Sequence, residues 1–206
     1  MTATGSFPQP TLVYDIGTSR YINLTNACTL QCRFCPKHNG SWQVRGHELE
    51  LHFNPKAEVI IPQLGDLTQV DEVVFCGFGE STLRLEELLK IARYLKSQQV
   101  RVRLNTDGLG NLVHKRNIIP ELAECVDALS ISLNAQNEAI YHQHCRPTLA
   151  GSWQACLDFI EAAAREIPDV TATAIEGLEG VDIAACERLA HERGAKFRKR
   201  VLDQMG

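Results

Sequence analysis

Three cysteines stand close together near the start of the chain, in a CxxxCxxC array. Cys28, Cys32 and Cys35 follow the strand-like run 21–24. Three thiolates at this spacing can bind three irons of a cubane [4Fe–4S] cluster, whereas four thiolates would close all four irons. The fourth iron is then open to a small molecule, and an open metal position is typical of a chemical site. The array therefore predicts a reactive iron–sulfur centre.

A structural zinc site is the main alternative for the same cysteines. Zinc in such sites takes four Cys or His ligands, and His38, three residues after Cys35, is available as the fourth. Free thiols are a further alternative, because cysteine is often buried in proteins as a small apolar side chain. The spacing favours the cluster and leaves both alternatives open.

Length, charge and cysteine usage limit the class of protein. The chain has 206 residues and a net charge of −4 at pH 7, which favours one domain over residues 1–206 and gives no general attraction to nucleic acid or anionic membranes. No apolar run approaches the roughly 20 residues that span a bilayer. Residues 1–6 lack the pattern of a secretory signal. Eight cysteines without such a signal favour metal ligands or free thiols over disulfides, and predict a cytoplasmic protein.

Strand and helix patterns alternate after the array. Short β-branched or aromatic runs predict buried parallel strands, and apolar residues recurring every three or four positions predict helices. A hairpin is expected over residues 11–24, with Gly17-Thr18 near its turn. The expected strands are 21–24, 73–76, 100–104, 128–133, 170–175 and 196–201, and the expected helices are 82–97, 118–125, 151–167 and 182–193.

Repeated βα units predict a parallel sheet with helices outside it and right-handed connections. The pattern holds about six units, whereas a full eight-stranded barrel typically needs about 250 residues. The predicted fold class is therefore α/β, as a partial (β/α)6 TIM-like barrel. Ligands of such sheets bind at the carboxyl ends of the strands, so functional residues are expected just after each strand.

Gly77-Phe78-Gly79-Glu80 follows the second expected parallel strand. Two glycines let a backbone bend sharply and approach a ligand closely. The bent backbone offers carbonyls and Glu80 offers a carboxylate, which together suit a ligand ammonium group. The alternative is a strand-to-helix turn in which Glu80 and Ser81 cap the next helix.

Polar side chains also follow the next two strands. Asn105 and Thr106 can present an amide and a hydroxyl to a ribose, or can form an ordinary Asx turn. Ser132 and Asn134, two residues apart, are expected on one face of a strand. Two polar residues on a buried strand favour a ligand contact, and bonding to the local backbone is the alternative.

Further candidates lie near the expected mouth of the barrel. Arg146 can bind a carboxylate or phosphate through two parallel hydrogen bonds, or can simply be exposed. Cys76 and Cys145 are candidate thiol hydrogen donors, with buried free thiols as the alternative. The basic segment 196–200 is expected to form a solvated sheet edge rather than a nucleic-acid contact.

The cysteine array, the GxGE tetrapeptide and the βα order together resemble the radical S-adenosylmethionine (radical SAM) superfamily. Phe78 stands where the family's GGE motif has its middle glycine. Longer segments look like the TatD-associated radical SAM proteins, whose genes lie beside, or are fused to, a TatD-type metal-dependent hydrolase. These segments are 13–17, 21–26, 73–80, 103–108 and 130–135.

The resemblance implies a cofactor set and a site. Cys28, Cys32 and Cys35 would hold a [4Fe–4S] cluster, and SAM would bind its open iron. Phe34 would pack near the adenine, with an ordinary core aromatic as the alternative. The remaining implied SAM contacts are Gly77, Phe78, Gly79 and Glu80 around the methionine amino group, and Asn105, Thr106, Ser132 and Asn134 around the ribose and carboxylate.

The reaction implied by the resemblance is reductive cleavage of SAM to a 5′-deoxyadenosyl radical, which abstracts hydrogen from a substrate. A small molecule or nucleoside is the favoured substrate, and a protein, as in the glycyl-radical activases, is the variant. Implied partners are an electron donor such as flavodoxin or ferredoxin and a TatD-type hydrolase. An oxygen-sensitive centre is expected. A zinc-stabilised binding module without catalysis is the alternative function.

Overall fold

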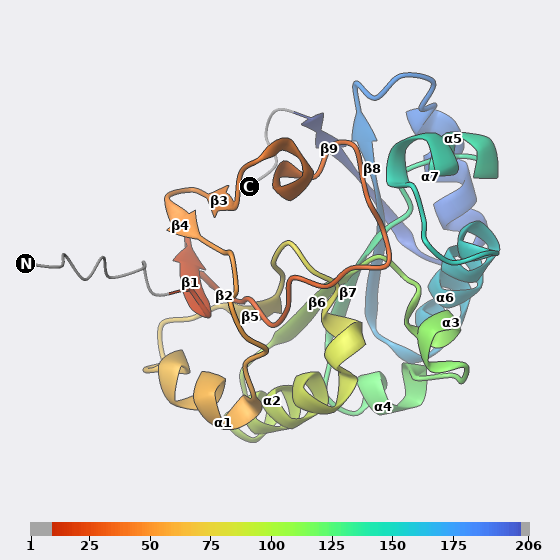
Figure 1. Cartoon of the computed structure of the whole chain (residues 1–206). Helices are drawn as coiled ribbons and strands as arrows, with labels where there is room; N and C mark the ends of the chain where they lie inside the picture. The colour runs from red at the N-terminus through yellow and green to blue at the C-terminus, as the bar shows by residue number, and fades with distance from the viewer. Residues whose placement is uncertain (1–9, 203–206) are drawn as a thin grey trace, which may run out of the picture.

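A computed structural model describes residues 10–202 of the chain, and its centre is one sheet of seven strands (Figure 1). Six strands run parallel, and β1 adds to β2 in the antiparallel direction. The strands, in their order across the sheet, are β1 (Val13–Ile16), β2 (Ser19–Ile22), β5 (Glu72–Phe75), β6 (Val102–Thr106), β7 (Ala128–Ser132), β8 (Asp169–Glu176) and β9 (Lys196–Val201).

The larger helices lie outside the sheet, while the segment between β2 and α1 lies on its concave side (Figure 1). Because β1 and β9 stand at opposite ends of the strand order, the barrel stays open. The predicted α/β partial barrel of six parallel strands is therefore confirmed. Its other elements are η1 (Pro36–Asn39), β3 (Gln43–Val44), β4 (His47–Glu48), α1 (Ala57–Ile60), η2 (Ile61–Leu64), η3 (Ser81–Arg84), α2 (Leu85–Ser97), α3 (Gly110–His114), α4 (Ile119–Ala123), α5 (Glu138–Cys145), α6 (Ser152–Glu166) and α7 (Ile183–Glu192).

The entry hairpin turns at Gly17-Thr18 as predicted. Gly17 has a φ of 61°, in the left-handed region that glycine adopts without steric cost, and Ile16 pairs with Ser19 across the turn. β2 lies two residues earlier than expected, because its parallel register with β5 begins at Ser19 and ends at Ile22. Residues 1–6, the segment without a signal pattern, lie outside the described residues.

Two other boundaries differ from the prediction. The expected helix 82–97 is divided into the 3-10 turn η3 and the α-helix α2. The expected strand 100–104 is β6, which continues through Thr106 because Asn105 and Thr106 pair with β7. The sequence analysis missed α3, α5 and the β3–β4 hairpin. Elements this short have weak periodic patterns and depend on tertiary packing.

Alternation along the strands separates an apolar outer face from a polar concave face. Ile22, Phe75, Leu104 and Ile131 are fully buried in the core that also includes the apolar side of α2. The strand positions that alternate with these buried residues therefore face the concave side of the sheet. Asn105 and its β7 partner Ser130 are among them. Across residues 10–202, no helix combines the length and apolarity needed to cross a bilayer.

Ion pairs cross-link the strand starts at the bottom of the concave face. Arg103 binds Glu72 with Nη2 to Oε1 at 2.8 Å, and the Ser19 hydroxyl donates to the same oxygen at 3.2 Å. Burial alone would raise the pKa of Glu72, but these bonds and the Arg103 charge lower it overall. Asp169 accepts from Arg101 at 2.7 Å and from Lys196 at 3.0 Å. Each of these charged side chains at this end of the concave face therefore has a partner of opposite charge.

Candidate functional site

The cysteine array lies in a loop after β2, at the carboxyl ends of the strands. Its backbone turns through bonds from Cys35 N to Cys32 O at 3.1 Å and from His38 N to Cys35 O at 3.0 Å. The loop is tied to the end of α5, because Gln31 N donates to Cys145 O at 3.0 Å and Arg33 N donates to His144 O at 2.9 Å. Backbone hydrogen bonds within the loop and to the end of α5 therefore fix the position of the array.

Cys28, Cys32 and Cys35 are half-buried, and none forms a disulfide. Burial, with a smaller effect of Asp107, raises the pKa of Cys28 to about 12. A hydrogen bond with Cys145, together with burial, raises the pKa of Cys32, and burial raises that of Cys35. The free thiols are therefore protonated at neutral pH. Cluster ligands are thiolates, so binding a cluster here would release protons.

The zinc interpretation requires four ligands around one ion. Within residues 10–202, no three His, Cys, Asp or Glu side chains converge closely enough to bind a single metal ion. His38, the candidate fourth ligand, is exposed. A cubane cluster makes a different demand, because each thiolate binds its own iron. Among the described residues, the three thiols therefore lack the convergence that a single zinc ion needs, whereas a cluster does not require it.

The glycine turn after β5 packs directly against the segment that leads into the cysteine loop. A Cβ added at Gly77 would collide with the Asn23 side chain, whose Cγ would lie at 3.2 Å. A Cβ added at Gly79 would lie 2.7 Å from the Ala27 carbonyl oxygen and closer still to the Thr25 carbonyl. Independently of any ligand, the Asn23 side chain thus opposes a Cβ at Gly77, and close backbone packing excludes one at Gly79.

Gly79→Ala is expected to destabilise the protein severely, because the Thr25 and Ala27 carbonyls are backbone atoms that cannot move aside cheaply. A loss of roughly 3 kcal/mol or more is the scale expected for such a clash. Gly46→Ala is the control, since Gly46 has open space around it and only its φ of 87° opposes a side chain, at about 1 kcal/mol. Urea unfolding of both variants measures the difference; equal losses would contradict the packing argument.

Phe78 occupies the middle of the same turn. Its ring meets the edge of Trp42, with the centroids 5.9 Å apart and the planes at 78°. Trp42 belongs to the loop that follows the cysteine array. A side chain at this position therefore adds an aromatic contact between the glycine turn and that loop, in place of the family's middle glycine.

The Glu80 carboxylate is buried and accepts four hydrogen bonds from the protein. Oε1 accepts from Thr82 N at 3.0 Å, from the Thr82 hydroxyl at 2.7 Å and from the Thr106 hydroxyl at 2.9 Å, while Oε2 accepts from Asp107 N at 2.7 Å. The capping alternative is therefore present in the structure. Glu80 and Thr106 bind each other, so what this turn still offers to a ligand is its backbone.

Asp107 is a buried acid that the sequence analysis did not single out. Its side chain accepts from Leu109 N at 2.9 Å and from the Thr29 hydroxyl, one residue after Cys28. Burial and the adjacent Glu80 carboxylate raise the pKa of Asp107 well above its usual range. The one available sequence signal was that Asp107 directly follows Asn105 and Thr106, at the end of β6.

Asp107→Asn is expected to become more stable than the wild type as the pH rises. A raised pKa means that the folded state retains a proton that the unfolded state loses above about pH 4. Wild-type stability therefore falls as the pH rises from about 4 through the raised pKa, and asparagine removes this contribution. Urea unfolding from pH 4 to pH 8 measures it; a constant difference between the two proteins would contradict the assignment.

Asn134 places an unpaired acceptor near the array. It lies just beyond β7, where its φ of 59° breaks the strand alternation, so it does not share a strand face with Ser132 as expected. Its Nδ2 donates to Cys145 Sγ at 3.6 Å, whereas its Oδ1 is buried with no hydrogen-bond partner among the described residues. A buried acceptor without a partner can take a hydrogen bond from a ligand hydroxyl or ammonium group.

Asn105 and Ser132 face the concave side from neighbouring strands. Asn105 Oδ1 accepts from Arg103 Nη1 at 2.9 Å, and its side chain also bonds the Cys76 thiol. Ser132 is half-buried. Burial raises the pKa of Cys76, which keeps that thiol protonated.

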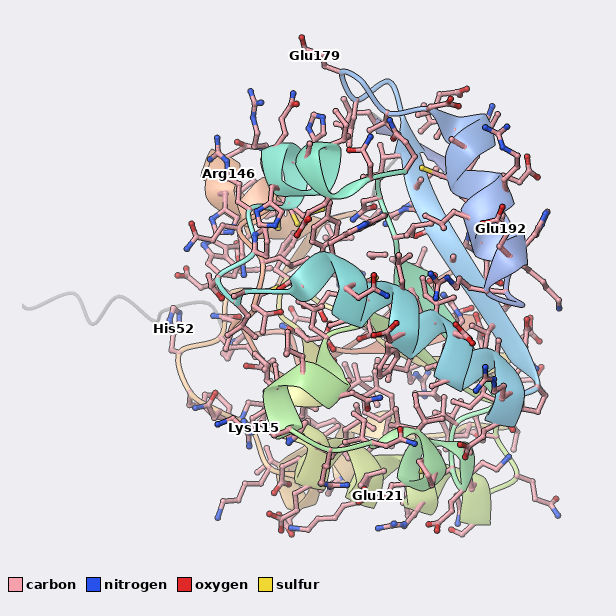
Figure 2. All side chains as sticks on the ribbon, turned by 90° about the vertical axis from the view of Figure 1, so that its right-hand side faces the viewer. His52, Lys115, Glu121, Arg146, Glu179 and Glu192 are labelled. Atoms are coloured by element: carbon pink, nitrogen blue, oxygen red, sulfur yellow. The ribbon has the colours of Figure 1, made fainter. Side chains whose placement is uncertain are left out.

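Two cavities flank the cysteine loop. One, of about 500 Å³, lies between this loop and the segments after β8 and β9, and Phe34, His144 and Leu202 are among its lining residues. The other, of about 450 Å³, is lined by Gln31, Arg33, His38, Asn39 and Arg146. Figure 2 shows Arg146 at the end of α5, on the outside of the molecule. Arg146 is therefore separate from the concave face on which Asn105 and Ser132 lie.

The sequence analysis assigned two arginines of β9 to a solvated edge. Arg198 donates from Nη2 to the Ser130 hydroxyl at 3.2 Å, across the concave face. Arg200 is half-buried and lies near Cys76. The expectation of a wholly solvated basic edge is therefore wrong for Arg200. The alternation of 196, 198 and 200 along a strand was a signal that could have indicated a shared face.

Comparison with known proteins adds the family. The model of the radical SAM superfamily matches residues 22–192. No curated protein is similar enough in sequence to count as a relative. Among solved structures, SuiB from Streptococcus suis bound to its precursor peptide SuiA superposes with a TM-score of 0.68, at 14% identity, over 88% of this chain and 38% of that one.

Two further solved structures share the fold. Methylornithine synthase (PylB) gives a TM-score of 0.60 at 12% identity, over 89% of this chain and 53% of PylB. The radical SAM methyltransferase TsrM from Kitasatospora setae, solved with cobalamin and a [4Fe–4S] cluster, gives 0.58 at 8% identity, over 85% of this chain and 35% of TsrM. The chain thus spans about a third to a half of the length of these proteins. Because the family model covers most of its residues, the chain belongs to the radical SAM superfamily, whose enzymes use a [4Fe–4S] cluster and SAM.

Proposed function

We propose that this chain binds a [4Fe–4S] cluster through Cys28, Cys32 and Cys35 and cleaves SAM reductively to act on a substrate. The observation that carries the proposal is the placement of three half-buried thiols in one loop at the carboxyl ends of a parallel sheet. When bound and reduced, the cluster supplies the electron that breaks SAM into methionine and a 5′-deoxyadenosyl radical, which abstracts a hydrogen atom from the substrate.

The chain's own residues then position and shield SAM. The backbone of Gly77, Phe78 and Gly79 lies against the cysteine loop and offers carbonyls to the methionine ammonium, with Glu80 holding the turn through Thr82 and Thr106. Asn134 offers its unpaired oxygen to a SAM hydroxyl or ammonium. We assign Asn105 and Ser132 to the ribose and carboxylate region, and Phe34, which lines the cavity beside the loop, to the adenine.

The finer assignment is to the TatD-associated radical SAM proteins, supported by the sequence segments that resemble them. We propose one domain over residues 1–206, a cytoplasmic and oxygen-sensitive protein, an electron donor such as flavodoxin or ferredoxin, and a functional link to a TatD-type hydrolase. A small molecule or nucleoside is the proposed substrate, and Arg146, which lines the outer cavity, is a candidate contact. SuiB, solved with a bound precursor peptide, supports a peptide as the second candidate.

An anaerobic assay tests the proposal. The protein is reconstituted with iron and sulfide, reduced with dithionite and given SAM, and 5′-deoxyadenosine and methionine are measured by chromatography. Production of both, dependent on reductant and on the three cysteines, is the expected result. A colourless protein that binds one zinc ion and leaves SAM intact would overturn the proposal in favour of a metal-stabilised binding module.

A further inference from the structure

The concave face of the sheet has an uneven distribution of charge. At the strand starts, Arg103 and Arg101 are paired with Glu72 and Asp169, so each of these cations has a carboxylate partner. Nearer the carboxyl ends, the cations on this face are Arg198 and Arg200 of β9, which alternation places on the same side.

Neither arginine has a carboxylate partner among the described residues. Arg198 makes a hydrogen bond to a neutral group, from Nη2 to the Ser130 hydroxyl at 3.2 Å. Arg200 is half-buried, and the charged or titratable groups that act on it are Cys76 and Arg198. The other basic residues of the same strand are paired, Lys196 with Asp169 at 3.0 Å and Lys199 with Glu176 at 2.9 Å.

A half-buried guanidinium without a counter-charge is costly to maintain in a folded protein. Burial lowers the pKa of Arg200, yet arginine stays protonated in proteins. The second cation beside it adds repulsion. Two guanidinium groups on one strand face present several N–H donors toward the same space, which suits an oxyanion able to accept paired hydrogen bonds.

We propose that Arg198 and Arg200 form the binding site for an anionic group of the substrate, a carboxylate or a phosphate. This inference rests on the proposed function, because it names the substrate class of that same site. The anion would neutralise both cations at the carboxyl-end half of the concave face. Neighbouring strands supply the hydroxyls of Ser130 and Thr173.

Space for the rest of the molecule is available beyond the end of β9. The cavity of about 500 Å³ beside the cysteine loop is bounded by Leu202, two residues beyond Arg200, and by Gly177 and Leu178 after β8. Small-molecule sites commonly have volumes of about 300–1,000 Å³. A substrate anchored by its anionic group at β9 would therefore extend toward Phe34 and the cysteine array.

Calorimetric titration of the reconstituted, anaerobic protein tests the site with two probes, inorganic phosphate and succinate. Arg200→Gln and Arg198→Gln are each expected to weaken binding of the preferred probe at least tenfold. Lys199→Gln is the matched control, because it removes one positive charge from the same strand on the opposite face, and it is expected to change affinity less than twofold. Comparing the two probes distinguishes a phosphate from a carboxylate.

Arg200→Lys is a second variant that tests the site even if the glutamine variants fail to fold. It retains the charge but not the paired donors, so binding weaker than wild type but stronger than in Arg200→Gln is expected. Equal weakening by Lys199→Gln would overturn the inference and indicate general charge attraction. Absence of binding of either probe to the wild type would also overturn it. Because calorimetry does not depend on SAM cleavage, failure of the anion site and failure of the proposed function can be told apart.

Discussion

Replacing Cys32 with alanine is expected to leave the reconstituted protein without a [4Fe–4S] cluster and without SAM cleavage. Cys32 is the middle cysteine of the array, and two remaining thiolates could hold only two irons of a cubane. Iron and sulfide per chain, the visible absorbance of the cluster and 5′-deoxyadenosine formation measure the result. A fall in 5′-deoxyadenosine to background is the expected magnitude.

Alanine variants of two cysteines outside the array, Cys125 and Cys145, are the controls for this experiment. Cys125 is buried near the end of α4, where its thiol donates to Glu121 O at 3.5 Å, so Cys125→Ala should retain its iron. Cys145 contacts Cys32 through a thiol hydrogen bond but lies outside the array. Cys145→Ala should therefore also retain iron. Full iron content with normal SAM cleavage in Cys32→Ala, or loss of the cluster in Cys145→Ala, would contradict the assignment of ligands.

Replacing Glu80 with alanine is expected to lower the stability of the cluster-free protein by about 3 kcal/mol. The substitution removes four hydrogen bonds and leaves the Asp107 N–H and the Thr106 hydroxyl without their acceptor in a buried region. Each such unsatisfied group costs about 1–3 kcal/mol. For a chain of this length, the melting temperature should fall by roughly 6–12 °C.

A comparison of variants separates a structural role of Glu80 from direct binding of SAM. Glu80→Gln retains an amide oxygen as acceptor and should lose less stability than the alanine variant. Glu58→Ala, at an exposed position in α1, should change stability by no more than about 0.5 kcal/mol. If Glu80→Ala melted like the wild type but bound SAM much more weakly, the carboxylate would be a ligand group and the structural role would be wrong.

The superfamily and the general fold could be predicted from the sequence because they depend on local patterns. Cys28, Cys32 and Cys35 are so close in sequence that one loop must contain them, wherever that loop lies. Strand and helix periodicity requires only neighbouring residues, and the right-handed βα rule then orders the sheet. The entry turn at Gly17-Thr18 is local in the same way.

The roles of individual polar side chains depended on contacts between distant segments. Glu80 looked available to a ligand until Thr106 and Asp107, 26 and 27 residues later, were seen to occupy its oxygens. The glycines of the turn suggested a ligand site, but packing against Asn23 explains Gly77, and packing against Thr25 and Ala27 explains Gly79.

Charge on β9 shows the same division between sequence and structure. Arg198 and Lys199 are adjacent and carry the same charge, so composition cannot tell them apart. The pleat of the strand sends Lys199 to Glu176 on the outside and Arg198 toward Ser130 on the concave face. The sequence by itself determined the βα architecture and the cysteine array, which short-range patterns specify. Only the tertiary structure decided which charges are neutralised and which are open to a ligand, because that depends on contacts between strands that are separated in the sequence.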